Sequence, residues 1–371
     1  MFSRPVLLTF AVALGLLAGC ADRADRPAGD PSPPVTPPGR AGAAGPPSAA
    51  AGPPTAPISP TGPIRLAFGG DVHFSAQLEP LVGRPDALAE LAPYLGVADL
   101  AMVNLETAIT VRGRPEPKQF HFRTSPQALD RLAEAGVDVV TMANNHAVDY
   151  GPDGLADTLD AKQDSPIPIV GVGADAAEAY APAYLQVRGS TVAVLGATQI
   201  PDWTLARWTA TDSRPGVAAA ASPTKLAAAV RRARTKADVV VVYLHWGSDY
   251  TECPNSLQRS TAKALTEAGA DVVLGAHAHQ VQGAGWLGRS YVAYGLGNFV
   301  WWRRNNEVDS RSGVLTLSVT GRRVTEARWT PMRVSPDGIP RVPDDQAEQD
   351  RLLAGWNAVR RCAALTADPP P

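Results

Sequence analysis

Five short segments of the chain concentrate the residue types that bind metal ions or transfer protons. They are Gly70–His73, Asn104–Glu106, Asn144–His146, His245 and Gly275–His279. Their aspartate, glutamate, asparagine and histidine side chains supply oxygen and nitrogen atoms that divalent metals accept. Each segment directly follows a run of mostly apolar residues, which is typical of a buried parallel strand. Because α/β proteins gather ligands at the carboxyl ends of such strands, the pattern predicts a metal site, one that holds two ions.

The spacing within the segments predicts which side chains lie together. Asp71 and His73 are two residues apart in an extended stretch, so both side chains leave the same face, and His277 and His279 share that spacing. Glu106 is the candidate carboxylate for a bridge between two cations. Two cations about 3.5–4 Å apart can polarise a phosphoryl or acyl oxygen and generate a hydroxide nucleophile near neutral pH.

Asn145 and His146 have separate predicted roles, although they are neighbours in the chain. Asn145 offers a carbonyl oxygen suited to a hard cation. His146 could protonate the leaving group as a general acid. Any one of these signals is weak, because a lone histidine after a strand is more often structural. All six histidines of the chain fall in or near the five segments, so the joint pattern favours a metal site.

The first residues predict export and membrane attachment. Residues 1–19 form a signal peptide whose apolar stretch, Val6–Leu17, is too short to span a bilayer. The ending Leu17–Cys20 resembles the lipobox of bacterial lipoproteins, in which the cysteine is lipidated; the alternative is an ordinary secretory signal. Residues 20–62 then comprise the lipidated cysteine and a disordered tether, since Pro, Ala and Gly dominate. We expect an extracytoplasmic protein anchored to the cell membrane.

The net charge bears on possible binding partners, and the cysteine content bears on disulfide formation. A formal net charge of −2 argues against nucleic acid as a partner. Two cysteines follow the predicted anchor, Cys253 and Cys362. An exported compartment permits a disulfide between them, and two unpaired buried thiols are the alternative.

Alternating strand-like and helical stretches predict the fold. The near copies Leu132–Val140 and Leu265–Val273 each end a helix with glycine and continue into an apolar strand, as βαβ units do. Later, Val314–Val319 and Val324–Trp329 predict an antiparallel hairpin, and Ala347–Arg361 a terminal helix before a disordered tail. So many strands need two sheets with helices on their outer faces. Strand-like runs occupy Ile64–Phe68, Leu100–Val103, Val137–Met142, Ile167–Val170, Tyr184–Val187, Thr191–Leu195, Val239–Leu244, Val272–Leu274 and Tyr291–Tyr294.

The order of the motifs is similar to that of the calcineurin-like metallophosphoesterase superfamily. Within it, the chain resembles the CapA group, which is associated with capsule or poly-γ-glutamate synthesis. The resemblance implies an α/β/β/α sandwich, with a metallophosphatase-like domain over residues 63–303 and the hairpin, helix and tail over 304–371. The matching motifs are Gly70–His73, Val103–Thr107, Ala143–Gly151, His245–Tyr250, Gly275–His279 and Tyr294–Phe299.

The resemblance also implies a role for each site residue. Two divalent ions, of Mn, Zn, Fe or Mg, would be bound, with Glu106 as the bridging acid and His146 as the catalytic histidine. The sequence departs from the family pattern where Asn-Leu-Glu106 replaces a Gly-Asp pair and where Ala278 replaces a proline. The first ion would take Asp71, His73 and His279, and the second Asn145, His245 and His277.

Substrate contacts are harder to assign. Asn104 and Arg123 are candidates, and Lys118 could also bind an anion, although strand packing with a solvated base explains the two basic residues equally well. The leading hypothesis is a metal-dependent hydrolase that cleaves a phosphoester or a γ-glutamyl amide during capsule or envelope polymer metabolism, beside capsule-synthesis membrane proteins. The alternative is a non-catalytic factor that binds or exports an anionic polymer through the same metals. A structural lipoprotein with a degenerate site ranks last.

Overall fold

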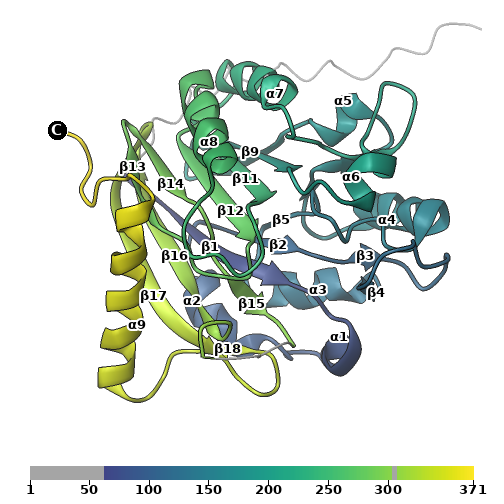
Figure 1. Cartoon of the computed structure of the whole chain (residues 1–371), viewed down its shortest axis with the longest axis horizontal. Coiled ribbons are helices and arrows are strands. Elements are labelled where there is room, and N and C mark those ends of the chain that lie inside the picture. Colours follow the sequence, from purple (N-terminus) through teal and green to yellow (C-terminus); the bar gives the residue numbers. More distant parts are fainter. Residues whose placement is uncertain (1–61, 303–306) are drawn as a thin grey trace, which may run out of the picture. The chain divides into compact units, whose positions relative to one another are not determined.

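The computed structural model describes residues 62–302 and 307–371. The predicted signal peptide, Cys20 and nearly all of the tether lie outside these residues. Two sheets dominate the described part (Figure 1). Each of the nine predicted strand-like runs overlaps a strand, so the two-sheet α/β prediction is confirmed.

The larger sheet carries the first three ligand segments. Its order is β18-β17-β16-β1-β2-β5-β6, and β15 also pairs with β1. β1 runs parallel to β2 and β15, but antiparallel to β16. Apolar residues fill β1 and β2 because both faces of these strands are covered. The bounds are β1 Ile64–Val72, β2 Leu100–Leu105, β5 Val139–Thr141, β6 Ile169–Val170, β15 Asn298–Val300, β16 Arg311–Thr320, β17 Arg323–Val334 and β18 Pro340–Arg341.

The smaller sheet carries the remaining ligand segments. Its order is β13-β14-β12-β11-β9-β8, with parallel strands in the centre and antiparallel strands at both edges. Short strand pairs, β3 with β4 and β7 with β10, stand apart from both sheets. The bounds are β3 Ala108–Ile109, β4 Arg123–Thr124, β7 Val172–Gly173, β8 Ala183–Val187, β9 Ser190–Thr198, β10 Gly216–Val217, β11 Val239–Trp246, β12 Val272–His277, β13 Ala284–Leu287 and β14 Ser290–Ala293.

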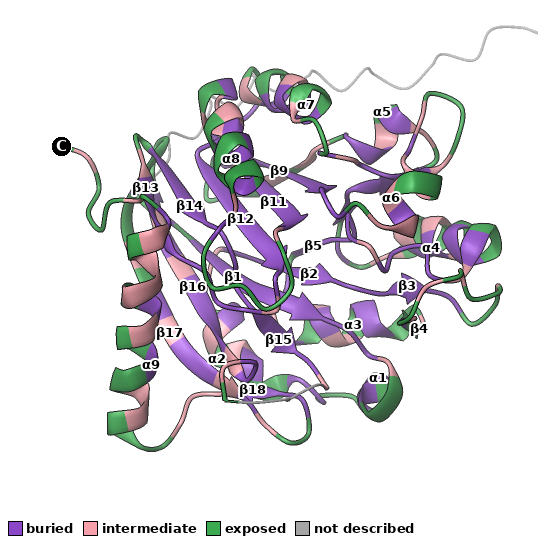
Figure 2. Ribbon diagram, in the orientation of Figure 1, coloured by how far each residue is buried: buried purple, intermediate pink, exposed green. Residues whose placement is uncertain are grey.

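Alternate residues of the strands point into different layers, as the period of two requires. Met102 packs between the two sheets, whereas Val103 packs against the helices beside the larger sheet. In the smaller sheet, Val241 faces the middle layer and Val240 faces α7 and α8. The order helix, sheet, sheet, helix follows, and Figure 2 shows the strands buried and the outer helix faces exposed.

The helices connect the strands as expected. Gly136 and Gly269, the glycines of the near copies, have φ of 88° and 110°, a left-handed conformation that side chains resist. The bounds are α1 Glu79–Val82, α2 Ala92–Leu95, α3 Gln127–Glu134, α4 Gly151–Asp164, α5 Ala176–Ala179, α6 Trp203–Trp208, α7 Thr224–Arg234, α8 Ser256–Ala268 and α9 Gln346–Val359, with 3-10 turns at Ala76–Leu78, Ala89–Leu91 and Arg360–Cys362.

The C-terminal part joins the larger sheet. The predicted hairpin forms β16 and β17, and the predicted helix forms α9, which lies along β17 (Figure 1). Trp329 and Trp356 stack between them with ring centroids 4.1 Å apart. In the tail, where we expected disorder, Thr366 exchanges backbone hydrogen bonds with Trp286. Among the described residues, no helix is long and apolar enough to cross a bilayer.

Candidate metal centre

The predicted ligands converge where the two sheets bring their strand ends together. Asp71 stands in β1, Glu106 follows β2, His245 stands in β11 and His277 ends β12. Tyr243 links the sheets beneath them, because its hydroxyl donates to the Gly69 carbonyl at 2.8 Å. All seven predicted ligands are buried except Asn145 and His279, which are partly buried.

The Gly-Asp motif has a steric reason in the path of β1. A side chain at Gly70 would place its Cβ 1.9 Å from the Gly297 carbonyl oxygen, so only glycine fits. Asp71 follows, and its carboxylate accepts from the His277 backbone N–H at 3.0 Å and from the Asn104 amide at 2.8 Å. The carboxylate is therefore held at a fixed orientation between the sheets.

Donor atoms of three other residues surround the Nε2 atom of His245. The His245 Nε2 atom lies 2.7 Å from Asn145 Oδ1, 3.1 Å from His277 Nδ1 and 3.3 Å from Glu106 Oε1. These atoms come from both sheets and from the loop after β5. Nitrogen and carboxylate or amide oxygen donors converging on one point are what a divalent cation requires.

Two close groups of donors can be separated. In each group, one ligand atom per residue lies within 4.8 Å of the others. One group joins Asp71, Glu106 and His245, and the other joins Glu106, His277 and His279. Glu106 belongs to both, as a bridging carboxylate would. This grouping differs from the one that the family resemblance implies. Asp71 and His279 belong to the ligand set of the first ion, and His245 and His277 to that of the second, but Asp71 groups with His245 and His279 with His277.

The electrostatics of the cluster fit a bound cation. Both oxygens of Glu106 are buried and have no hydrogen-bond partner among the described residues. Burial, together with the neighbouring Glu106 carboxylate, raises the pKa of Asp71 to about 8, and burial raises the pKa of Glu106 to about 7. A divalent ion would favour the ionised form of these two buried carboxylates and balance their charge. The donor set therefore fits a divalent metal.

His73 has surroundings unlike those of the other ligands. It stacks on Phe122 with ring centroids 4.5 Å apart and meets Trp301 edge-on at 4.4 Å. The Ser75 N–H donates to its Nδ1 atom at 3.1 Å, while the buried Nε2 atom has no partner among the described residues. Burial lowers the pKa of His73, which favours the neutral ring that metals bind.

The two late histidines sit in an unusual backbone. His277 and His279 have φ of 87° and 52°, in the left-handed region that non-glycine residues rarely adopt. His279 Nδ1 lies 2.9 Å from Asn298 Oδ1 and 3.6 Å from Asp71 Oδ2. Strain of this kind concentrates at functional sites, where the surrounding structure holds it.

His146 lies at the edge of the cluster and is paired with an acid. Its Nδ1 atom is 2.6 Å from Asp149 Oδ2, so that nitrogen donates and Nε2 is left to face the cluster, 3.9 Å from Glu106 Oε1. Burial lowers the pKa of His146, and the Asp149 carboxylate opposes that shift. The imidazole is therefore oriented by a carboxylate without lying among the closest ligand atoms.

Lys118 supports this pair. Its ammonium lies 2.7 Å from Asp149 and 3.4 Å from Asp202, and it also bonds the Asn145 carbonyl. Only 11% of its side chain is exposed. The structure thus engages Lys118 in holding the loop that carries His146, which leaves it poorly placed for a substrate anion.

The two candidates for substrate contact are placed very differently. Asn104 is fully buried, and its amide joins Asp71, His245 and Asn144, an arrangement that orients ligands. Arg123 is exposed, and its guanidinium lies 4.7 Å from the centroid of the Tyr150 ring.

Three tryptophans stand near motif residues in the sequence and differ in burial. Trp246 and Trp301 are buried, as core packing would have them, while Trp302 is partly buried beside His73.

Three further side chains support the site without having been assigned a role from the sequence. Asp149 orients His146, Asn298 contacts His279, and Asp249 Oδ1 lies 3.1 Å from His277 Nε2. Each stands inside one of the matching motifs, so the signal was present. Supporting residues share no periodicity with the ligands, which is why spacing alone did not distinguish them.

The fold and the cluster define a two-sheet α/β protein with a candidate divalent-metal centre. The chain belongs to the family described as bacterial capsule synthesis protein PGA_cap, whose model matches residues 65–301. All the predicted ligands lie within the matched residues.

Named relatives agree with this assignment. The chain is 31% identical over 250 residues to the PGA biosynthesis protein CapA of Bacillus subtilis (strain 168), a match covering 65% of each chain. It is also 31% identical over 252 residues to the capsule biosynthesis protein CapA of Bacillus anthracis, covering 64% of this chain and 60% of the relative. The chain therefore spans less than two thirds of either relative.

Among solved structures, the 5'-nucleotidase from Candida albicans SC5314 is similar with a TM-score of 0.42 and 10% identity. That match covers 80% of this chain and 58% of the other. The likeness is remote.

Proposed function

We propose that the protein is a metal-dependent hydrolase of the CapA type, active on poly-γ-glutamate or a related anionic polymer of the capsule or envelope. The observation that carries the proposal is the convergence of Glu106, Asn145 and His277 on His245, next to a histidine that an acid orients. Two divalent ions of Mn, Zn, Fe or Mg would supply Lewis acidity and an activated water.

His146 would transfer the proton in this reaction. Its Nδ1 atom is tied to Asp149, so Nε2 is the nitrogen that can hold a proton and give it to the leaving group. The nearby carboxylate stabilises the charged ring, as in other acid-oriented histidines. A protein that only holds polymer has no use for a proton donor at this position.

Arg123 would contact an anionic group of the substrate. It lines a cavity of about 320 Å³ with Ser75, Ser125 and Tyr150. Ser75 connects this cavity to the metal centre, because its backbone N–H donates to His73.

A substrate panel tests the hydrolase proposal. Purified protein loaded with Mn²⁺ should cleave either a model phosphodiester or γ-glutamyl oligomers, and chelation should abolish that cleavage. His146→Ala should lose the activity, whereas Tyr184→Ala, which removes an exposed ring from β8, should keep it. Polymer retention without cleavage by the wild type would favour the binding or export factor instead.

Membrane attachment forms a separate part of the proposal. We expect Cys20 to be lipidated and the protein to act outside the cytoplasm, beside capsule-synthesis membrane proteins. Two acyl chains would anchor it stably, whereas a single chain binds only marginally. Cys20→Ser should move the protein from the membrane fraction to the soluble one, or leave its signal uncleaved. An unchanged fractionation and gel mobility would reject lipidation.

A further inference from the structure

The His277 ring is held from two opposite sides. Its Nδ1 atom faces the cluster, 3.1 Å from His245 Nε2, while its Nε2 atom points away toward Asp249, 3.1 Å from Oδ1. The Asp249 side chain is 57% exposed, in contrast to the buried ligands. Asp249 thus touches the outer edge of a predicted ligand from the solvent side.

The segment that carries Asp249 is fastened at several points. It leaves β11 at Gly247, whose φ is 98°. The Tyr250 N–H donates to the Ala278 carbonyl, between the two late histidines, at 2.8 Å. Further along, Gln282 donates to the Thr251 carbonyl at 2.8 Å. The residue at position 278 therefore holds the segment through its backbone carbonyl, and this contact does not depend on its side chain.

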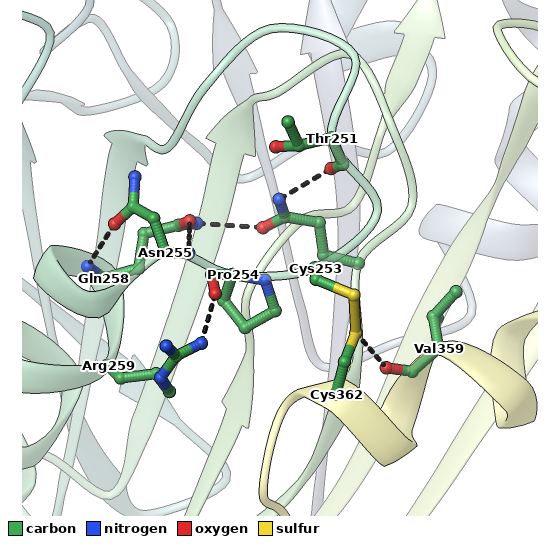
Figure 3. The surroundings of a disulfide bond; sticks show 9 residues. Thr251, Cys253, Pro254, Asn255, Gln258, Arg259, Val359 and Cys362 are labelled. Atoms are coloured by element: carbon green, nitrogen blue, oxygen red, sulfur yellow. Dashed lines mark hydrogen bonds between the residues drawn. A yellow bond between two sulfur atoms is a disulfide. The ribbon is translucent and has the colours of Figure 1, made fainter.

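A disulfide bond also fastens the segment that carries Asp249. Cys253 and Cys362 form a disulfide that spans 109 residues of sequence. Figure 3 shows it joining the loop before α8 to the 3-10 turn after α9, with Thr251 and its hydrogen bond nearby. The predicted pairing is thus present, and it lies four residues beyond Asp249.

We propose that Asp249 is a positioning residue for His277, and that the Cys253–Cys362 bond keeps the segment carrying Asp249 within reach of that ring. The inference rests on the proposed metal centre. A carboxylate that accepts from Nε2–H leaves the lone pair on Nδ1, the atom that faces the cluster. It also fixes the angle of the ring, and such supporting carboxylates typically change metal affinity by about 10–100-fold.

Titration of the metal-stripped full chain with Mn²⁺ tests the role of Asp249. Asp249→Ala should weaken the binding of one ion by about 10–100-fold and leave the other unchanged. Asp249→Asn, which keeps an acceptor oxygen, should recover part of the loss. The matched control is Glu252→Gln in the same segment, because Glu252 pairs with Arg311 at 3.1 Å and touches no ligand. It should bind as the wild type does.

The disulfide is tested by the double substitution Cys253→Ser with Cys362→Ser. The ion that Asp249→Ala weakens should also bind more weakly to this double variant. Adding Asp249→Ala to it should then lower the Mn²⁺ affinity by less than the same substitution does in the wild type. If the double variant does not fold, brief reduction of the folded wild type, followed by the same titration, replaces it. A lower Tm with unchanged Mn²⁺ affinity would overturn the part assigned to the disulfide.

Two results separate this inference from the function on which it rests. Wild-type protein that binds no Mn²⁺ would refute the metal centre and the inference together. Wild-type protein that binds Mn²⁺ while Asp249→Ala binds it equally well would refute the positioning role alone.

Discussion

The two sides of the candidate centre are built by different means. On one side, the donor atoms of Asn145 and His277 lie 2.7 Å and 3.1 Å from His245 Nε2. We call this the His245 side. On the other side, His73 lies between Phe122 and Trp301 and belongs to neither close group of donors. We call this the His73 side.

The surroundings of the two sides also differ in charge. The His73 side is bordered by the Arg123 cavity, whereas the His245 side is bordered by the Asp249 carboxylate. Arg123 would attract a polyanion, with Glu79 lining the same cavity, whereas Asp249 would repel it. The difference suggests that one side mainly holds metal, while the other combines metal binding with access for substrate.

Replacing the residue shared by both donor groups should have the largest effect. Glu106 is a member of both donor groups, so Glu106→Gln removes a charge that each ion would use. We expect metal analysis to find loss of both ions and no measurable turnover. Retention of one ion would mean that one of the two donor groups binds without Glu106.

His146→Ala should separate catalysis from metal binding. The ring stacks on Phe122 at 4.2 Å, which attaches it to the His73 side, yet it stands apart from the closest ligand atoms. Turnover should fall by about 10²–10⁴ while metal content stays near that of the wild type. Parallel loss of metal and turnover would make His146 a ligand.

Metal removal should destabilise the fold measurably. A ligand present at 100 times its Kd stabilises the folded state by about 2.7 kcal/mol, provided that the unfolded chain does not bind it. For a domain of this size that corresponds to roughly 4 °C in Tm. Thermal unfolding of stripped protein, with and without Mn²⁺, measures the difference, and an identical Tm would argue against an ion between Asp71 and Glu106.

Arg123→Gln should give the smallest effect, and only on the substrate. Because the side chain is exposed, we expect KM for an anionic polymer to rise about tenfold or less, with metal content unchanged. Arg207→Gln is the matched control, since Arg207 also lies over an aromatic ring, that of Trp203. An equal change in both variants would remove Arg123 from the substrate site.

Much of this architecture could be predicted because it follows from periodicity. Each of the nine buried apolar runs overlaps a strand, and the polar residues predicted as ligands at their ends lie together in one cluster. The pairing of β11 with β12, and the approach of Asp71 to the His277 backbone 206 residues away, depend on sheet order, which no local pattern encodes. Asp249 stands in a matched motif, but its spacing from His245 does not reveal that it contacts His277.

The hairpin of β16 and β17 has a consequence for how the chain can be shortened. The family match ends at residue 301, yet β1, which carries Asp71 and His73, is paired along Ile64–Phe68 with β16. A chain cut after residue 301 would turn β1 into an open edge, with a row of unpaired backbone groups beside apolar residues. Such an edge templates association with other chains, so the truncated protein should aggregate rather than persist as a smaller folded protein.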